Sequence, residues 1–547
     1  MGTGGGAGRV AVVGAGVGGL AAALDLAARG LEVVVLERAP APGGKMREVQ
    51  AGGARLDAGP TVFTMRRVFE SLFADAGARL CDHLSLRPAG VLARHAWSAR
   101  ERLDLHADPA RTAEAIGRFS GPAEAARYLG FVEHARRVYR TLEGPFIRAP
   151  RPTPASLAAA AGAAELWRTR PFSTLWTALG SHFHDPRLRQ LFGRYATYLG
   201  SSPFLAPATL MLVAHVEQEG VWMVEGGMHR VASALATLAE RHGARFHYGA
   251  EVAEIPVRDG RATGVRLASG EWVPADAVVV NADPAALGAG LLGRDAAGAG
   301  SAPGQRSLSA LTWALHARAE GFPLVRHNVF FGPDYAGEFD ALFRRGRLPD
   351  VPTVYVCAQD RGAEDRGAED RGAENPGAEG RGSEDGPAPD GPHRDGPERL
   401  FCLVNAPPTG DRGAPTPQEI ARCEERAFGL LERCGLLIHR RPEATAITGP
   451  TEFARLFPGT GGALYGRASH GWTASFARPG ARTRIAGLYL AGGGTHPGPG
   501  VPMAALSGRM AAASLVQDLA STGLSRRTAT PGGTWTRSAT TDATGSP

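Results

Sequence analysis

The segment from Val10 to Glu37 constrains the fold more than any other part of the sequence. It begins with a short apolar strand, passes through a glycine-rich turn into an Ala- and Leu-rich helix, and ends in a second apolar strand that closes on an acidic residue. Gly14, Gly16 and Gly19 have the G-x-G-x-x-G spacing, and Glu37 ends the second strand. In this context the pattern predicts a Rossmann-type βαβ unit that binds a dinucleotide.

Each residue of this pattern has a predicted task. Gly14 allows the tight turn, Gly16 lets a pyrophosphate approach a backbone without a Cβ, and Gly19 lets helix and strand pack closely. The free N–H groups at the start of the helix favour the anionic diphosphate. Glu37 is expected to hydrogen-bond the adenosine ribose.

The residues after Glu37 indicate which dinucleotide binds. Arg38 comes next, then Gly43-Gly44-Lys45 and Asp57-Ala-Gly-Pro-Thr61. A cation at Arg38 or Lys45 can neutralise phosphate charge, and the paired glycines let the chain pass close to a cofactor. The pattern resembles the flavoprotein superfamily of amine oxidases, protoporphyrinogen oxidases and carotenoid desaturases. A Pro- and Gly-rich loop with solvated charges is the alternative.

A second glycine-rich helix start lies near the C-terminus, in residues Gly487–Gly508. A short apolar strand runs into a Gly/Pro loop, and Pro502 suits the first turn of the helix that follows. The start of this helix favours the flavin pyrimidine edge, where negative charge develops on reduction. A purely structural loop is the alternative. Two such helix starts far apart in sequence favour one extended FAD over NAD.

The sequence resembles the bacterial carotenoid desaturases of the phytoene desaturase type over nearly its whole length. The resemblance is carried by Thr495-His-Pro-Gly-x-Gly-Val-Pro-Met503, by His184–Phe192 and by Gly220–Met228. Amine oxidases usually carry an acid where Gly493 stands. The motifs Ala196-Thr-Tyr-x-Gly200 and Ala214-His-Val-Glu-x-x-Gly-Val-Trp222 most resemble the 1-hydroxycarotenoid 3,4-desaturase (methoxyneurosporene dehydrogenase) branch.

This resemblance implies FAD as the cofactor and a set of cofactor-binding residues. Val252 is expected to contact the adenine through its backbone. The complete predicted set is Gly14, Gly16, Gly19, Glu37, Arg38, Gly44, Lys45, Gly59, Pro60, Val252, Gly493, Val501 and Met503. The sequence indicates no catalytic acid or base.

Composition excludes several other classes of protein. Lys45 is the only lysine among 60 basic residues, and no basic run is interleaved with aromatic residues, so nucleic-acid binding is not expected. The five cysteines lack C-x-x-C spacing, which argues against disulfides and zinc and favours a reducing compartment. His182 and His184 have no second ligand cluster, and Asp185 before Pro186 suits a helix N-cap better than a metal. No transmembrane segment and no signal peptide are predicted.

The fold class expected is α/β, with a discontinuous Rossmann-type FAD-binding domain and an inserted α+β substrate domain. Residues 1–62, 221–290 and 441–520 are assigned to the FAD-binding domain. Residues 63–220, largely helical, and 291–440 are assigned to the substrate domain. Strands are predicted at 246–252, 262–267 and 277–280, and helices at 122–142 and 186–198.

Residues 360–399 are predicted to form a disordered insertion between two strands, 353–357 and 400–404. Asp-Arg-Gly-Ala-Glu occurs three times in tandem there, and the stretch has no aliphatic residue larger than alanine. An acidic interaction segment is the alternative. The Ser/Thr/Gly-rich residues 521–547 are expected to be a disordered tail.

Three further candidates stay open at this stage. Cys402 is interpreted as a buried thiol rather than a nucleophile. His496 either faces the substrate or hydrogen-bonds the loop backbone. The apolar segment Ala206–Val216 either lines a substrate tunnel or forms an ordinary core helix.

The function expected is FAD-dependent dehydrogenation of a long acyclic carotenoid, specifically as a 1-hydroxycarotenoid 3,4-desaturase. A cation spread over a polyene needs positioning and exclusion of water more than an acid–base pair. The protein is expected in the cytoplasm with peripheral membrane contact, and the electron acceptor, oxygen or a quinone, is left open. Phytoene desaturase, carotenoid isomerase and saturase are alternatives, as is a non-catalytic prenyl- or lipid-binding protein on the same fold.

Overall fold

The computed structural model describes residues 8–301, 304–362 and 396–521. A parallel sheet of five strands forms its first part, in the order β22-β15-β1-β2-β9. Its strands are β1 (Arg9–Val13), β2 (Glu32–Glu37), β9 (Arg245–Tyr248), β15 (Ala277–Val280) and β22 (Leu488–Leu490). β1, α1 (Val17–Ala27) and β2 form the βαβ unit predicted at 10–37.

Alternate residues of β1 reach opposite faces of this sheet, so both faces are buried. Val10 and Val12 pack on one face against α1, α2 (Arg66–Asp75), α10 (His229–Arg241) and α17 (Val501–Ser521). Ala11 and Val13 pack on the other, under the antiparallel strands β10 (Val252–Glu254), β13 (Gly264–Leu267) and β14 (Trp272–Pro274). A sheet covered on both faces is what a parallel α/β fold requires.

Two predicted strands of this region are broken. The strand expected at 246–252 splits into β9 and β10 because Gly249 turns the chain with a φ of +71°. The strand expected at 262–267 begins as β12 (Arg261–Ala262), which pairs with β11 (Val257–Arg258), and continues as β13. The buried strand predicted at 277–280 is confirmed as β15.

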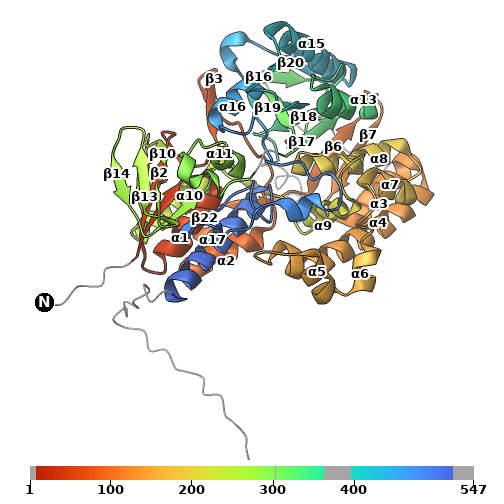
Figure 1. Cartoon of the computed structure of the whole chain (residues 1–547). Coiled ribbons are helices and arrows are strands. Elements are labelled where there is room, and N and C mark those ends of the chain that lie inside the picture. The colour runs from red at the N-terminus through yellow and green to blue at the C-terminus, as the bar shows by residue number, and fades with distance from the viewer. Residues whose placement is uncertain (1–7, 302–303, 363–395, 522–547) are drawn as a thin grey trace, which may run out of the picture.

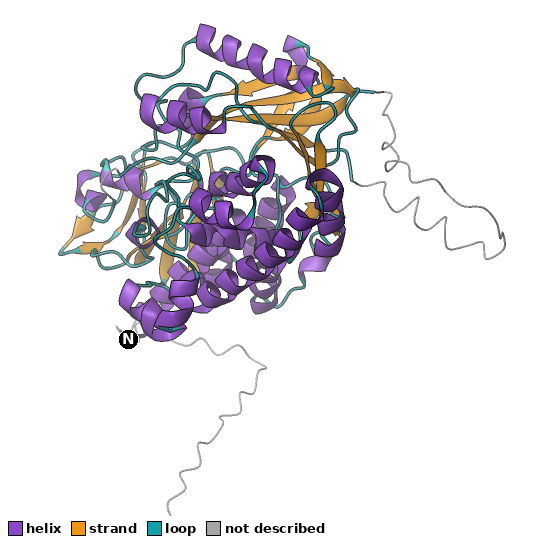
Figure 2. Cartoon of the chain, turned by 90° about the vertical axis from the view of Figure 1, so that its right-hand side faces the viewer, coloured by secondary structure: helices purple, strands orange, loops and turns teal. Residues whose placement is uncertain are grey.

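A second, larger sheet has the order β20-β16-β19-β18-β17-β6-β7, with β21 paired to β16 (Figures 1 and 2). It contains β6 (Val91–Ala96), β7 (Arg102–His106), β16 (Ser309–Glu320), β17 (His327–Phe330), β18 (Val354–Ala358), β19 (Glu398–Ala406), β20 (Leu437–His439) and β21 (Thr445–Thr448). The boundary expected at residue 441 is therefore too early, because β21 still belongs to this sheet.

The hairpin predicted around the repeat is confirmed, since β18 and β19 pair antiparallel. The insertion limits of 360 and 399 were too wide. Arg361 donates to the buried Glu398 at 2.6 and 2.8 Å, and Arg399 pairs with Asp360, so two ion pairs hold the neck. The rest of the insertion, residues 363–395, and the tail after Ser521 lie outside the described residues.

A helical lobe packs against the large sheet (Figure 2). It comprises α3 (Pro109–Ser120), α4 (Pro122–Leu142), α5 (Pro154–Ala161), α6 (Ala163–Arg168), α7 (Leu175–His182), α8 (Pro186–Gly193) and α9 (Leu212–Gln218), with a π-helical turn η2 (Glu143–Ile147) and 3₁₀ segments η3 (Arg194–Leu199) and η4 (Ala208–Met211). α4 coincides with its prediction, whereas the helix expected at 186–198 changes to a 3₁₀ helix after Gly193.

The remaining elements are short, apart from α15. They are β3 (Glu48–Ala51), β4 (Ala54–Asp57), β5 (Leu86–Pro88), β8 (Trp222–Val224), α11 (Pro284–Gly288), α12 (Arg294–Ala297), α13 (Tyr335–Asp340), α15 (Pro417–Arg433), α16 (Pro450–Leu456) and the short helices η1 (Leu80–Asp82), η5 (Ala341–Arg345), η6 (Pro442–Ala444) and η7 (Ala474–Ala477). Of the helices that the structure describes, none combines the length and apolar character that crossing a bilayer needs.

Candidate active site

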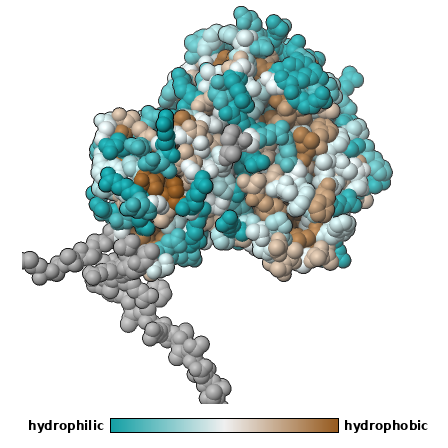
Figure 3. Space-filling view, viewed as in Figure 1, coloured by the Kyte–Doolittle hydropathy of each residue, from teal (hydrophilic) through white to brown (hydrophobic). Residues whose placement is uncertain are grey.

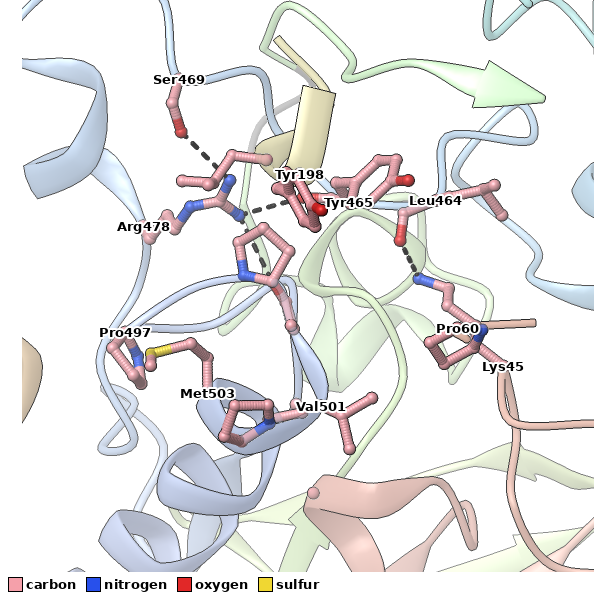
Figure 4. A pocket seen from close by; sticks show the side chains of 18 of the residues that line it. Lys45, Pro60, Tyr198, Leu464, Tyr465, Ser469, Arg478, Pro497, Val501 and Met503 are labelled. Atoms are coloured by element: carbon pink, nitrogen blue, oxygen red, sulfur yellow. Dashed lines mark hydrogen bonds between the residues drawn. The ribbon is translucent and has the colours of Figure 1, made fainter. Parts of the chain in front are cut away.

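One large cavity, of about 1120 Å³, joins all three parts of the molecule (Figure 4). The parallel sheet supplies glycine turns, the large sheet supplies Thr312 and Phe401, and the helical lobe supplies apolar side chains such as Leu210. Of the predicted cofactor residues, those that line the cavity are Gly14, Gly16, Glu37, Arg38, Gly44, Lys45, Gly59, Pro60, Val252, Gly493, Val501 and Met503. The thirteenth, Gly19, lies beneath the turn instead.

The fingerprint turn has the geometry that its glycines predict. Gly14 has a φ of +95°, in the left-handed region that glycine tolerates best. A Cβ on Gly19 would lie 2.1 Å from the Gly14 carbonyl oxygen, so only glycine fits there. The buried Glu37 carboxylate accepts from the N–H groups of Ala15 (2.6 Å) and Ala39 (2.8 Å). These bonds fix the acid at the cavity wall, and its contact with a ribose stays a prediction.

The loop containing Gly43 and Gly44 lies directly on this turn. Gly43 donates its N–H to the Ala15 carbonyl at 2.9 Å, and a Cβ on Gly44 would lie 3.1 Å from the Gly16 Cα. Gly59 packs equally closely, because its Cβ would lie 1.8 Å from the Lys45 carbonyl oxygen. The sequence-distant glycines thus form one cradle without side chains, which fits a dinucleotide held against backbone.

The two predicted cations have protein partners. The Lys45 ammonium donates to the Leu464 carbonyl at 2.6 Å, and burial lowers its pKa while Asp283 opposes the shift. The Arg38 guanidinium donates to the carbonyls of Arg455 and Leu456. Both side chains therefore tie the chain around residues 455–464 to the cofactor cradle. Their action on phosphate charge remains a prediction.

The C-terminal loop meets the first helix at glycines. A Cβ on Gly18 would lie 2.8 Å from the Gly492 Cα, and a Cβ on Gly508 would lie 2.0 Å from the Gly18 carbonyl oxygen. Helix α17 therefore crosses α1 with backbone against backbone, and both helices start at the cavity. Val501 and Met503 stand on this start, beside Pro497 (Figure 4).

His496 belongs to the loop rather than to the substrate wall. It is buried, its Nε2 lies 3.0 Å from the Phe146 carbonyl oxygen, and its ring packs edge-on against the Phe146 ring. The ring therefore ties the loop to η2 of the helical lobe instead of bonding the loop's own backbone, and it is not among the residues that line the cavity. Cys402 is buried as expected, and burial raises its pKa well above the usual range of a thiol.

His182, His184 and Asp185 are the residues weighed above as metal ligands. Asp185 caps α8 by accepting from the Arg187 N–H at 2.8 Å, as predicted. Within residues 8–301, 304–362 and 396–521, no three metal-ligating side chains gather in one place.

Two residues of the site were missed by sequence reasoning. Asn281 follows β15 and holds its side chain beneath the fingerprint, 2.7 Å from where a Cβ on Gly16 would stand. Arg478 is buried beside the loop that follows β22 and donates to the carbonyls of Tyr465, Arg467 and Gly493. Burial lowers its pKa to about 10, so it keeps its charge at neutral pH. Asn281 had a signal, its place at a buried strand end, whereas Arg478 is one arginine among many.

The segment Ala206–Val216 lies between the cavity and the core of the helical lobe, and its contact with a substrate stays a prediction. Leu210, Leu212, Val213 and Val216 line the cavity, whereas Met211 and Ala214 face the core of the helical lobe. An apolar arm of the cavity therefore extends from the cofactor cradle into the helical lobe.

Comparison with known proteins identifies the broad class of protein to which this chain is similar. Residues 17–303 match the family of flavin containing amine oxidoreductases. A putrescine oxidase structure has a TM-score of 0.56 at 16% identity, covering 93% of this chain and 99% of that one, which shows a shared fold.

Curated relatives narrow the class. A hydroxyneurosporene desaturase from Rubrivivax gelatinosus is 56% identical and covers 97% of this chain and 98% of its own length. The hydroxyneurosporene desaturase from Cereibacter sphaeroides is 46% identical over 94% of this chain and 98% of its own length. A zeta-carotene-forming phytoene desaturase from Myxococcus xanthus is 31% identical over 92% of each chain. The chain belongs to the carotenoid desaturase family of flavin-dependent oxidoreductases. Its cofactor is FAD.

Proposed function

We propose that this protein desaturates a C–C bond of a long acyclic carotenoid, and specifically the 3,4 bond of a 1-hydroxycarotenoid. The observation that carries the proposal is the continuity of one cavity. It runs from the glycine cradle to an apolar arm in the helical lobe, so a rod-shaped apolar molecule can reach the cofactor. The names of the curated relatives support the same substrate class.

The glycine cradle would hold FAD, which would supply an acceptor for the hydride that leaves the allylic carbon of the substrate. Release of a proton from the neighbouring carbon would complete the loss of two hydrogen atoms and leave a double bond between the two carbons. The protein's own contribution is to hold the polyene in place and keep water out. The buried Lys45 and Arg478, which line the cavity, would stabilise negative charge on a group bound beside them.

Pigment analysis tests the activity. Cells that make acyclic 1-hydroxylated carotenoids should, on expression of this protein, accumulate a product with two hydrogen atoms fewer and a longer chromophore. Conversion of phytoene alone would favour the phytoene desaturase alternative, and a change of geometry or a gain of hydrogen would favour the isomerase or saturase. A purified protein without flavin absorbance would favour the non-catalytic lipid binder.

We further propose that the mouth of the cavity rests on a membrane, from which an apolar substrate enters. Trp167, Phe172 and Trp472 are 72%, 65% and 42% exposed and line the cavity. The ring centres of Trp167 and Phe172 lie 6.1 Å apart, and those of Phe172 and Trp472 lie 5.3 Å apart. Apolar residues also gather on the lower right of Figure 3, where Figure 1 places α5 and α6. Aromatic side chains suit the interface of a bilayer.

Liposome sedimentation tests this surface. The double variant Trp167→Ser/Phe172→Ser should bind phosphatidylcholine vesicles several-fold more weakly than the unmodified protein. Trp272→Ser is the matched control, since that ring is 39% exposed on β14, outside the cavity lining. Equal loss in both variants, or no binding by the unmodified protein, would contradict the membrane contact.

A further inference from the structure

A cluster of polar side chains interrupts the apolar wall of the cavity. Arg194 and Tyr198 on η3 and Glu217 on α9 all line the cavity. The Glu217 carboxylate accepts from the Tyr198 hydroxyl at 2.5 Å and from the Tyr195 hydroxyl at 2.8 Å. The Arg194 guanidinium lies 5.4 Å from the centre of the Tyr198 ring, and its charge acts on both Tyr198 and Glu217.

Folding alone gives no reason for this cluster. Burial raises the pKa of Glu217, and the tyrosine hydroxyl groups and the Arg194 charge counteract the shift. Buried charged groups rarely stabilise a fold more than apolar side chains of the same size. A cavity that held only a hydrocarbon would be better lined by Leu or Phe, because an apolar ligand offers no partner to the remaining donors and lone pairs of these groups.

The cluster lies on the side of the cavity that carries Tyr465 and Arg478: the charge of Arg194 acts on Tyr465, and Arg478 donates to the carbonyls of Tyr465 and Gly493. In Figure 4, Tyr198 lies beside Tyr465, close to Arg478 and Leu464 and across from Pro60 and Met503. In a 1-hydroxycarotenoid, a single carbon separates C1, which carries the oxygen, from the 3,4 bond. An oxygen-binding group is therefore expected near the cofactor rather than at the far end of the apolar arm, and the contacts through Tyr465 and Arg478 link this cluster to the loop of Gly493.

We propose that Arg194, Tyr198 and Glu217 bind the hydroxyl group of the substrate and thereby select hydroxylated carotenoids. The proposal rests on the desaturase function above. A guanidinium only donates hydrogen bonds and an ionised carboxylate only accepts them, whereas a hydroxyl group does both. A hydroxyl group can therefore accept a hydrogen bond from Arg194 and donate one to Glu217. A methyl ether can only accept one, and a hydrocarbon end can form neither.

The expected effect is a change of selectivity. Sites that hydrogen-bond a substrate hydroxyl reject analogues without it by up to about 10⁴-fold in kcat/KM. We expect the unmodified protein to prefer the hydroxylated substrate over its hydrocarbon analogue by at least about 100-fold, with the methyl ether in between. Arg194→Met should reduce this preference at least about 10-fold, acting on the hydroxylated substrate and sparing the hydrocarbon. Glu217→Gln should reduce the difference in kcat/KM between the hydroxylated substrate and its methyl ether. The Gln amide, unlike a carboxylate, can also donate a hydrogen bond to the ether oxygen.

The assay compares kcat/KM for the three substrates in detergent micelles, with flavin absorbance and melting temperature recorded for each variant. Arg189→Met is the matched control, because Arg189 also stacks on an aromatic ring, Trp176 at 4.6 Å, outside the cavity lining. If Arg194→Met lowers kcat/KM equally for all substrates, or if Arg189→Met alters selectivity as much, the cluster does not recognise the hydroxyl. Equal rates of the unmodified protein on all three substrates would overturn this inference and leave desaturation standing, whereas no conversion of any would overturn both.

Discussion

Helices α1 and α17 bring the two halves of the cofactor cradle together, and one glycine controls how closely they approach. In Gly508→Ala, the new Cβ would lie 2.0 Å from the Gly18 carbonyl oxygen and 3.0 Å from the Ala22 nitrogen. Because carbon atoms of this kind do not come within 3.0 Å of other atoms, the helices must separate by about 1 Å. Both helix starts line the cavity, so this separation also widens the cradle.

The magnitude follows from two opposing effects. Overpacking a well-filled helix contact costs about 1–3 kcal/mol of unfolding free energy. Replacing glycine by alanine inside a helix returns about 1 kcal/mol through helix propensity. Gly130→Ala isolates the second effect, since Gly130 lies inside α4 and a Cβ there meets nothing within 4 Å. The unfolding free energies of the two variants should therefore differ by about 1–3 kcal/mol.

Denaturant unfolding, followed by tryptophan fluorescence, measures the stability of both variants, and visible absorbance measures their flavin content. Gly508→Ala should unfold earlier and retain less flavin, whereas Gly130→Ala should unfold slightly later with full flavin. If both variants shift stability in the same direction and keep the same flavin content, backbone contact between α1 and α17 does not hold the cradle together.

Two further predictions concern titration and thiol chemistry. Burial raises the pKa of Glu338 to about 7, and hydrogen bonds from Thr353 counteract the shift. The folded state therefore binds the Glu338 proton more tightly than the unfolded state does. The contribution of this proton to the free energy of unfolding is complete below pH 4.5 and is lost as the pH rises through about 7. Glu338→Gln should gain up to about 3 kcal/mol over the unmodified protein between pH 5 and pH 8 in denaturant midpoints, and parallel pH profiles would contradict the shift. Of the five thiols, Cys81 alone is exposed, so a thiol reagent should label one cysteine per native chain and none in Cys81→Ser.

The parts of the fold predicted best from the sequence are those with short-range causes. The βαβ unit, helix α4 and the Asp185 cap depend on residues a few positions apart. The large sheet depends on pairing between strands far apart, such as β16 with β19. Of its eight strands only β18 and β19 were predicted, whereas β6, β7, β16, β17, β20 and β21 were not. The boundary at residue 441 failed for the same reason.

The candidate site shows the same division. The glycines were predictable because their spacing is local and each has a steric reason. Tyr198 and Glu217 were visible only inside two separate motifs, Ala196–Gly200 and Ala214–Trp222. Their hydrogen bond, which joins the motifs into one polar cluster, depends on how η3 packs against α9. Arg478 had no signal at all, because only burial distinguishes it from other arginines.

The polar cluster can fix the position of the substrate along the cavity, which apolar walls alone cannot do. A polyene has nearly the same apolar surface at each repeating unit, so hydrophobic walls hold it without fixing its position along the cavity. Hydrophobic contact is not directional, whereas hydrogen bonds have defined lengths and angles. A hydroxyl held between Arg194 and Glu217 would stop the chain from sliding, and would present one C–C bond to the cofactor at a fixed distance from the oxygen. If the proposed anchor holds, the choice of bond would follow from the anchored end of the substrate rather than from a catalytic acid or base.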